Sequence, residues 1–292
     1  MKRLLTILFL SLIVIAGCQE SKVTPTKGTT VTEVDQSVFP IVQKERNIFD
    51  SLYTRAKVEL KAVPPLEGMV NLINNKSKMF VSPRYFNKQE IDFLKKENTD
   101  IKTFKFCYNA VAIIGSKKNP TEKIRVDEIK DALLGNSRNY SFIIPQTNTS
   151  TYQYIKEEIL DNNNPKGVEV VTSDDDVLTR VEKNDSKLGI ISFNIVQDSS
   201  RVKFIQVGQL KNNVSRQESK KGLDVNYYTP HPGFVLKNYY PLRQIVYVYL
   251  NEIEMSPASG FTTFLTSYEG QKIALEQNLA PAAVPVKINE TQ

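Results

Sequence analysis

The chain has few of the residues that build catalytic and metal centres. Its 292 residues include two cysteines and one histidine, and no Cys/His cluster has the spacing of metal ligands. The histidine, His231, stands between prolines in a sequence typical of a rigid turn, so we expect a structural or solvent-facing role. The sequence also lacks a Gly-x-Ser-x-Gly nucleophile elbow and the glycine-rich loops that hold nucleotide phosphates. These absences do not exclude an enzyme, but they support none, and the sequence predicts a protein without a catalytic residue, a metal site or a cofactor.

Basic residues are not concentrated in one stretch. The formal net charge is +6, but Lys95-Lys96 and Lys220-Lys221 are only pairs, and no dense lysine and arginine stripe is present. Proteins that bind nucleic acid usually carry such a stripe. This weak basic balance suits solubility or a small anionic ligand, and we expect no nucleic-acid partner.

The N-terminus has the features of an export signal. Lys2-Arg3 precedes an apolar run, Leu4–Ile15, which is too short for a confident membrane span. The sequence Ile15-Ala16-Gly17-Cys18 then resembles the lipobox of bacterial lipoproteins. That resemblance implies that residues 1–17 are a signal peptide, that Cys18 is lipidated and that residues 18–28 form a tether. The alternatives are an uncleaved anchor or an ordinary secretory signal.

The remaining cysteine, Cys107, has no partner for an intramolecular disulfide if Cys18 is lipidated. It lies in the apolar, strand-like run Phe104–Ile114. A buried structural thiol is therefore expected here, rather than a nucleophile.

Helical and strand patterns alternate along the whole chain without an internal repeat. This alternation predicts an α/β fold with mostly parallel sheets. The expected strands are Lys78–Ser82, Thr103–Gly115, Ser141–Ile144, Val168–Thr172, Leu188–Phe193, Arg201–Leu210 and Tyr239–Leu250. Expected helices begin near Ser37, Asn87, Val126, Tyr152, Asp174, Pro257 and Tyr268, while Lys211–Thr229 is expected to be a surface loop.

Three times, an expected strand ends in a polar turn that begins a helix. In open α/β sheets, ligands bind at the carboxyl ends of strands, beside helix N-termini. If the three turns converge, their hydroxyls, backbone N–H groups and one guanidinium would suit a small oxyanion or a carboxylate. The predicted ligand-binding residues are Ser37, Ser82, Arg84, Asn148, Thr149, Ser150 and Thr151.

The alternative for these turns is that each only caps its own helix. Ser150-x-x-Gln153 fits a capping box, and Arg84 would then lie in solvent. The triplet Asp174–Asp176 is likewise expected to start a helix, because a calcium site needs more widely spaced oxygen ligands.

Several stretches, in order, resemble the phosphate-binding lipoproteins of ABC importers, a branch of the type II periplasmic binding proteins. The likeness covers nearly all of the mature chain, and its most specific part is Ser267-Tyr-Glu-Gly-Gln271. The stretches that carry it are Val81–Glu90, Cys107–Pro120, Ile129–Gly135, Leu188–Phe193, Tyr240–Tyr249 and Phe261–Pro281.

The resemblance implies two α/β lobes with the ligand cleft between them. Lobe one would comprise residues 29–107 plus about 239–292, and lobe two about 108–238. The hinges would lie near 104–110 and 222–240. Such proteins trap their ligand by hinge closure and pass it to the membrane subunits of the importer.

Two departures from the family pattern concern the ligand. Aligned on Thr151, the chain has Pro145 where the family has an arginine and Thr147 where it has an aspartate. The arginine would bind an anion in bidentate fashion, and the aspartate would accept from a protonated phosphate oxygen.

The sequence thus predicts a monomeric, lipid-anchored solute-binding protein for phosphate or a related small oxyanion. We expect it in the cell envelope, on the periplasmic or outer-surface side of a bacterial membrane. The alternative is an envelope lipoprotein that uses the same fold as a scaffold or interaction module with a weak or empty cleft.

Overall fold

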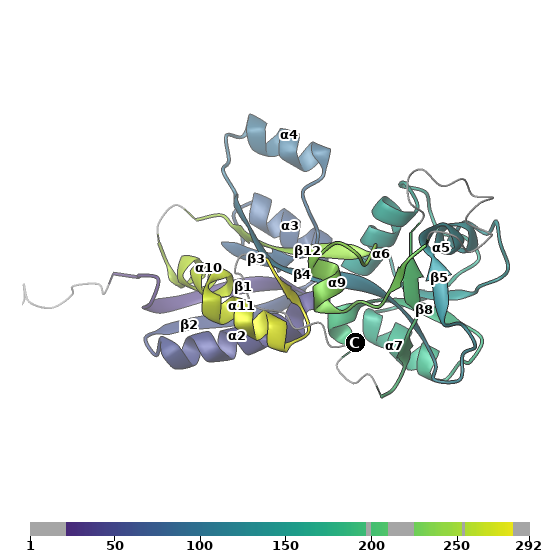
Figure 1. Ribbon diagram of the computed structural model, residues 1–292. Helices are drawn as coiled ribbons and strands as arrows, with labels where there is room; N and C mark the ends of the chain where they lie inside the picture. The colour runs from purple at the N-terminus through teal and green to yellow at the C-terminus, as the bar shows by residue number, and fades with distance from the viewer. Residues whose placement is uncertain (1–21, 197–199, 210–224, 253–254, 283–292) are drawn as a thin grey trace, which may run out of the picture.

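The computed structural model describes residues 22–196, 200–209, 225–252 and 255–282 (Figure 1). The predicted signal peptide, Cys18, most of the expected loop and most of the C-terminal tail lie outside the described residues. Within the described ranges, no helix is both long enough and apolar enough to span a bilayer.

One large sheet runs through the molecule, and a small sheet lies at one side. The large sheet has the order β2 (Ala56–Val63), β1 (Gly28–Asp35), β3 (Met79–Ser82), β12 (Arg243–Leu250), β4 (Lys102–Gly115), β8 (Leu188–Ser192), β6 (Phe142–Pro145), β7 (Glu169–Val171), with β9 (Lys203–Phe204) and β13 (Ala280–Pro281) also paired with β4. The small sheet is β11 (Tyr227–Tyr228), β10 (Gln206–Gly208) and β5 (Lys123–Arg125). The predicted strand at Arg201–Leu210 is therefore two short strands in different sheets.

The large sheet is mixed, which corrects the expectation of mostly parallel pairing. The outer pairs β1–β2, β1–β3, β6–β7 and β6–β8 are parallel, as βαβ units require. In the middle, β12 is antiparallel to β3 and β4, and β4 is antiparallel to β8. The reason is that β12 carries the chain back alongside β4, so the two strands that link the halves must run in opposite directions.

Helices cover the sheet on both faces (Figure 1). They are α2 (Phe39–Leu52), α3 (Pro65–Ile73), α4 (Lys88–Lys96), α5 (Val126–Leu133), α6 (Ser150–Tyr154), α7 (Asp174–Glu182), α9 (Pro232–Leu236), α10 (Pro257–Thr266) and α11 (Tyr268–Glu276). Short helical turns lie at η1 (Gln36–Val38), η2 (Ile155–Ile159, π-helical) and η3 (Phe193–Ile195). The helix expected to begin near Asn87 is α4, and Asn87 and Glu90 form a capping box, in which each side chain accepts from the other residue's backbone N–H.

Residues of β4 belong to two different hydrophobic clusters. Phe106 and Cys107 belong to the cluster under α2, α10 and α11, whereas Ala110 and Val111 belong to the cluster around α5 and β6. We call these two parts the first half, built on β1–β3, and the second half, built on β6–β8. The change of cluster supports the predicted lobe boundary, which stays a prediction. Cys107 is buried and makes no disulfide, as predicted for a structural thiol.

The two linking strands contain an irregularity. Val246 pairs with Cys107, but the next residue, Tyr247, pairs with Lys105, so Phe106 is an extra residue in β4. The carbonyl of Phe106 accepts a 2.7 Å hydrogen bond from Nε2 of Gln271, which is fully buried. The Oε1 atom of Gln271 in turn accepts from the backbone N–H of Ala282 at 2.7 Å.

A buried carboxyl on α2 makes the stability of the first half depend on pH. Glu45 is fully buried, and among the described residues neither of its side-chain oxygens has a hydrogen-bond partner. Burial, together with the charge of Glu276, raises the pKa of Glu45 to about 9. In the folded protein this carboxyl is therefore protonated at neutral pH, whereas it ionises near pH 4.5 once the chain unfolds.

We predict that Glu45→Gln stabilises the protein in alkaline buffer. The wild type should lose stability as pH rises from about 4.5 towards 9, on the order of 1 kcal/mol per pH unit, because only its unfolded state releases this proton. The variant should lack this pH-dependent loss of stability. Urea denaturation at pH 5 and pH 8 measures the free energy of unfolding of both proteins. If the variant and the wild type differ by the same amount at both pH values, the prediction is wrong.

Candidate functional site

Three serine hydroxyls meet at one buried carboxylate. Asp35 is 1% exposed. Its Oδ1 atom accepts from the backbone N–H of Ser37 at 2.9 Å and from the Ser37 hydroxyl at 2.8 Å. Its Oδ2 atom accepts from the Ser82 hydroxyl at 2.8 Å and from the Ser150 hydroxyl. We call Asp35 and these three serines the Asp35 cluster.

The fold brings the four residues together at strand ends. Asp35 ends β1 and caps η1, and Ser82 ends the parallel neighbour β3, so the two lie at the same edge of the sheet. Ser150 comes from the second half, where it opens α6 after β6. The predicted convergence of the three turns is thus found for their serines. The sequence analysis did not include the acceptor, Asp35, among the predicted ligand-binding residues.

The charge on the Asp35 cluster is negative or neutral rather than positive. Burial raises the pKa of Asp35 above its ordinary value, and the hydrogen bonds from the three serines oppose that rise. Among the described residues, no lysine or arginine forms an ion pair with this carboxyl. A site made of neutral donors around one acceptor is therefore present, without the guanidinium of the family pattern.

A second buried carboxyl lies behind the first. Asp174, the first residue of α7, accepts from the Thr151 hydroxyl and from the backbone N–H of Ser192, both at 2.7 Å. Burial, with a contribution from the charge of Asp35, raises the pKa of Asp174 to about 6. Thr151, predicted to bind ligand, thus holds the start of α7 against α6.

Thr149 and Asn148 occupy different positions from those expected of direct ligands. Thr149 is the N-cap of α6, and its hydroxyl accepts from the backbone N–H of Tyr152 at 3.2 Å. The predicted capping box with Ser150 as the cap is therefore wrong. Thr149 has the extended backbone of a cap, whereas Ser150 is already helical and turns its hydroxyl to Asp35. Asn148 is exposed at the rim.

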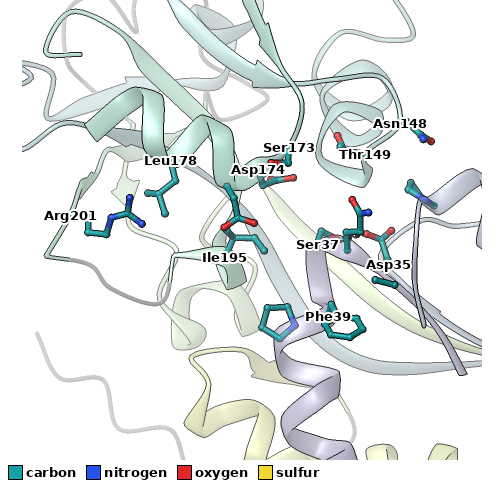
Figure 2. A pocket seen from close by; sticks show the side chains of 15 residues that line it. Asp35, Ser37, Phe39, Asn148, Thr149, Ser173, Asp174, Leu178, Ile195 and Arg201 are labelled. Carbon is teal, nitrogen blue, oxygen red and sulfur yellow. Dashed lines mark hydrogen bonds between the residues drawn. The ribbon is translucent and has the colours of Figure 1, made fainter. Parts of the chain in front are cut away.

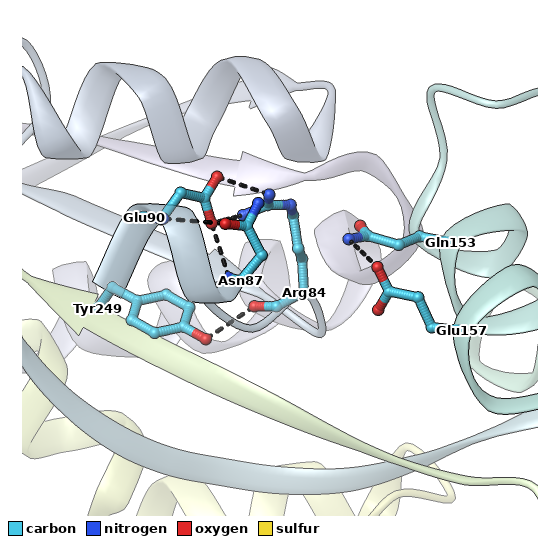
Figure 3. Close-up of polar contacts among 6 residues, drawn as sticks. All are labelled: Arg84, Asn87, Glu90, Gln153, Glu157 and Tyr249. Carbon is cyan, nitrogen blue, oxygen red and sulfur yellow. Dashed lines mark hydrogen bonds and ion pairs between the residues drawn. The ribbon is translucent and has the colours of Figure 1, made fainter. Parts of the chain in front are cut away.

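Arg84 is neither in solvent nor part of the Asp35 cluster. It is 5% exposed, and its guanidinium donates to both carboxylate oxygens of Glu90, at 3.0 and 2.7 Å (Figure 3). The backbone carbonyl of Arg84 accepts from the Tyr249 hydroxyl at 2.7 Å. The same Glu90 carboxylate completes the Asn87 capping box, so one side chain fixes both the arginine and the start of α4.

A cavity of about 580 Å³ opens beside the cluster, between the two halves (Figure 2). Its polar lining includes Asp35, Ser37 and Asn148, and Asp174 reaches it from the second half. Phe39, Pro40, Pro65, Leu178 and Ile195 contribute apolar surface. Arg201 also lines the cavity, but it donates to Glu182 at 2.6 Å. Within the ranges described, no group of three histidine, cysteine or acidic residues is placed to hold a metal ion.

Few polar contacts join the halves across this region. Besides the Ser150–Asp35 bond, Nδ2 of Asn194 donates to the backbone carbonyl of Ser37 at 3.0 Å. On the far side, the Tyr85 hydroxyl donates to Glu158 at 3.0 Å. The two halves are therefore in contact at the Asp35 cluster.

We predict that Ser82→Ala and Ser150→Ala are coupled through Asp35. Each should lower the free energy of unfolding by about 1–3 kcal/mol, because each removes one donor from a buried carboxyl. The change in the free energy of unfolding in the double variant should differ from the sum of the two single changes by at least about 0.5 kcal/mol. As a matched control, Ser173→Ala should add to Ser82→Ala, because Ser173 caps α7 without touching Asp35. Urea denaturation gives all of these values, and additivity of Ser82→Ala with Ser150→Ala would refute the coupling.

Comparison with known proteins places this geometry in a family. A family model described as a PBP (periplasmic-binding-protein) superfamily domain matches residues 19–269. The phosphate-binding protein PstS of Borreliella burgdorferi is 24% identical over 292 residues, which cover 95% of this chain and 98% of the relative.

Solved structures show the same fold. A crystal structure from Clostridium perfringens, described as a phosphate ABC transporter substrate-binding protein with bound phosphate, has a TM-score of 0.71 and 18% identity over 87% of this chain and 100% of that one. An ABC-type phosphate transport receptor from Vibrio cholerae has a TM-score of 0.65 and 17% identity over 86% and 100%. The chain therefore belongs to the PBP superfamily and has the mixed α/β fold of the substrate-binding proteins of phosphate ABC transporters.

Proposed function

We propose that this chain is a lipid-anchored, extracytoplasmic solute-binding protein that captures phosphate or a related protonated oxyanion for an ABC-type importer. The observation that carries the proposal is the Asp35 cluster, in which three hydroxyl donors from separate strand ends surround one acceptor between the halves. The relatives whose names include phosphate support the choice of ligand.

In this proposal, opening of the halves breaks the Ser150–Asp35 bond and admits the ligand. The hydroxyls of Ser37, Ser82 and Ser150 then donate to the unprotonated oxygens of the anion. The Asp35 carboxylate accepts a hydrogen bond from the protonated oxygen of the anion. It thus replaces the family's aspartate, whose position is occupied here by Thr147. At neutral pH phosphate carries at least one proton and sulfate carries none, so an acceptor here selects phosphate.

The other predicted residues have supporting parts in this proposal. Thr149 and Thr151 fix the turn that presents Ser150, and Asn148 lies at the rim of the cavity. Arg84, which follows β3, adds positive charge near the anion. Its effect on anion binding is reduced because Glu90 already forms an ion pair with it.

A second candidate function is a scaffold or interaction module with a weak or empty cleft. It is favoured by one specific observation: all three serine donors are already used by the chain's own carboxylate. An incoming anion must replace that carboxylate or share its donors, which lowers its net affinity.

The two candidates differ in how the mature protein, purified in detergent, responds to anions. We predict that phosphate at a hundredfold excess over its Kd stabilises the fold by about 2.7 kcal/mol, whereas sulfate has little effect. In Asp35→Asn, phosphate should bind at least about tenfold more weakly, and sulfate should bind measurably, because the amide offers a donor in place of an acceptor.

Calorimetric titration and thermal denaturation measure both responses. Asp175→Asn is the matched control, since Asp175 lines the same cavity but is exposed and lies outside the Asp35 cluster. If neither anion binds the wild-type protein, the oxyanion proposal fails and the scaffold function is favoured.

The anchor is tested separately. Cells that express the chain should incorporate labelled palmitate into it, and Cys18→Ser should abolish the label and release the protein from the membrane fraction. Cys107→Ser should keep the label, because that thiol is buried. Labelling that survives Cys18→Ser would overturn the assignment of Cys18.

A further inference from the structure

A hollow of about 730 Å³ lies in the first half, toward the start of β1. Thr29, Thr30, Val31 and Glu33 of this strand line it, whereas Asp35 ends the strand. Because β1 has eight residues, its two ends are about 23 Å apart. In Figure 1 the start of β1 lies at the end of the first half that points away from the second half. The oxyanion proposal uses none of this surface.

The register of the large sheet explains why the hollow exists. β2 pairs with β1 along its whole length, but β3 pairs with β1 only at Glu33 and Val34. Among the described strands, none pairs with Gly28–Thr32 on the β3 side. The opposite wall of the hollow is formed by Lys76–Lys78, just before β3, and by Met255 with Ser256, just before α10. The hollow is thus a notch in the sheet, open to solvent.

The charge on this notch is positive. Lys22, Lys76 and Lys78 line it, and all three are exposed. In the part of the chain described, none of the three forms an ion pair. The acid among the described lining residues is Glu33, which is 5% exposed. Its carboxylate already accepts from Lys61 at 3.1 Å and from Asn71 at 2.9 Å.

Exposed apolar side chains lie among these lysines. Val23, Val31 and Met255 line the same notch and are 54%, 50% and 74% exposed. Lysines interspersed with exposed apolar side chains are typical of surfaces that contact the headgroup region of a bilayer. We call this set the lysine face; it comprises Lys22, Val23, Val31, Lys76, Lys78 and Met255.

The N-terminal segment fixes the distance between the lysine face and Cys18. Thr24 and Lys27 form a tight turn, with backbone hydrogen bonds of 2.9 and 3.1 Å in the two directions. The carbonyl of Pro25 packs on α10 at Gly260, where a Cβ atom would come within 2.0 Å of it. The chain is therefore held to the first half from this turn onward. Lys22 is only four residues after Cys18, and four residues span at most about 14 Å.

We propose that the lysine face binds the anionic headgroups of the bilayer that holds the lipid anchor. This inference rests on the proposed lipidation of Cys18, because the short connection brings the face to the membrane surface. Each lysine near an anionic surface strengthens such binding about fivefold. The Asp35 cluster lies at the other end of β1, so headgroup contact at the lysine face leaves the cleft uncovered.

The test uses the lipidated mature protein with a single fluorescent label, reconstituted into vesicles. Met255→Cys carries an environment-sensitive nitrobenzoxadiazole group, and Cys107 does not react because it is buried. The vesicles consist of phosphatidylcholine alone or of phosphatidylcholine and phosphatidylglycerol in equal parts. The emission should shift to the blue in the anionic vesicles and return when salt is added, because salt screens the attraction. Equal emission in the two kinds of vesicle would overturn the proposal.

A label at Asn139→Cys is the positional control, since Asn139 is exposed in the second half. Its emission should be the same in both kinds of vesicle. A blue shift of equal size at this position would contradict the placement of the contact at the lysine face.

Combined charge changes identify the residues that bind. Lys22→Gln, Lys76→Gln and Lys78→Gln together should shift the equilibrium between bound and free face on the order of a hundredfold toward free, and so remove the blue shift. The matched control changes Lys118, Lys166 and Lys183, which are exposed in the second half, to glutamine. The control should keep the blue shift, and the same loss in both combined variants would refute the assignment.

Two further readouts separate this inference from the proposed function. If the wild-type protein does not float with the vesicles in a density gradient, the anchor at Cys18 fails and this inference fails with it. If the protein floats but the blue shift is absent, this inference alone fails. Phosphate binding should be equal in the two combined variants, because neither changes a residue of the Asp35 cluster.

Discussion

The centre of this protein depends on a carboxyl group that is removed from water and held by three hydroxyls and one backbone N–H group. A buried charge normally requires a partner of opposite charge, and Asp35 has only neutral donors. Those donors come from three separate segments, one of them 115 residues away in the sequence. The carboxyl group of Asp35 thereby joins the start of α6 to the ends of β1 and β3, and it lines the large cavity.

Three acidic side chains in the interior have pKa values that burial raises. Asp35, Asp174 and Glu45 are each buried, and burial raises the pKa of each. For a group whose folded pKa is raised, the stability that it contributes is complete below its unfolded pKa and is lost as pH rises through the folded value. For Asp174 this window runs from about 4 to about 6. The stability that Asp174 and Glu45 contribute therefore falls as pH rises through these windows.

The sequence predicts those parts of the site that are set by local pattern. Ser82 and Ser150 follow short apolar strands and precede helical runs, and strand ends of one sheet must meet, so their convergence could be foreseen. Asp35 could not be singled out in this way, because an aspartate at a strand end is also a common helix cap, and only the tertiary structure shows what fills its acceptor sites. The sequence analysis predicts that Arg84 binds the ligand, because the sequence pattern does not show that Glu90, six residues later, forms an ion pair with it.

The extra residue at Phe106 bears on how the two halves move. A bulge interrupts the ladder of hydrogen bonds between β4 and β12, so bending of this ribbon should concentrate there. Gln271 ties the bulge to α11, which makes the pivot a defined point rather than a diffuse one. Arg243 and Gln244 lie beyond it, in unbroken register with Ala110 and Asn109. Residues beyond the bulge would therefore keep their strand pairing while the ribbon bends, so any movement of the second half carries them as one unit.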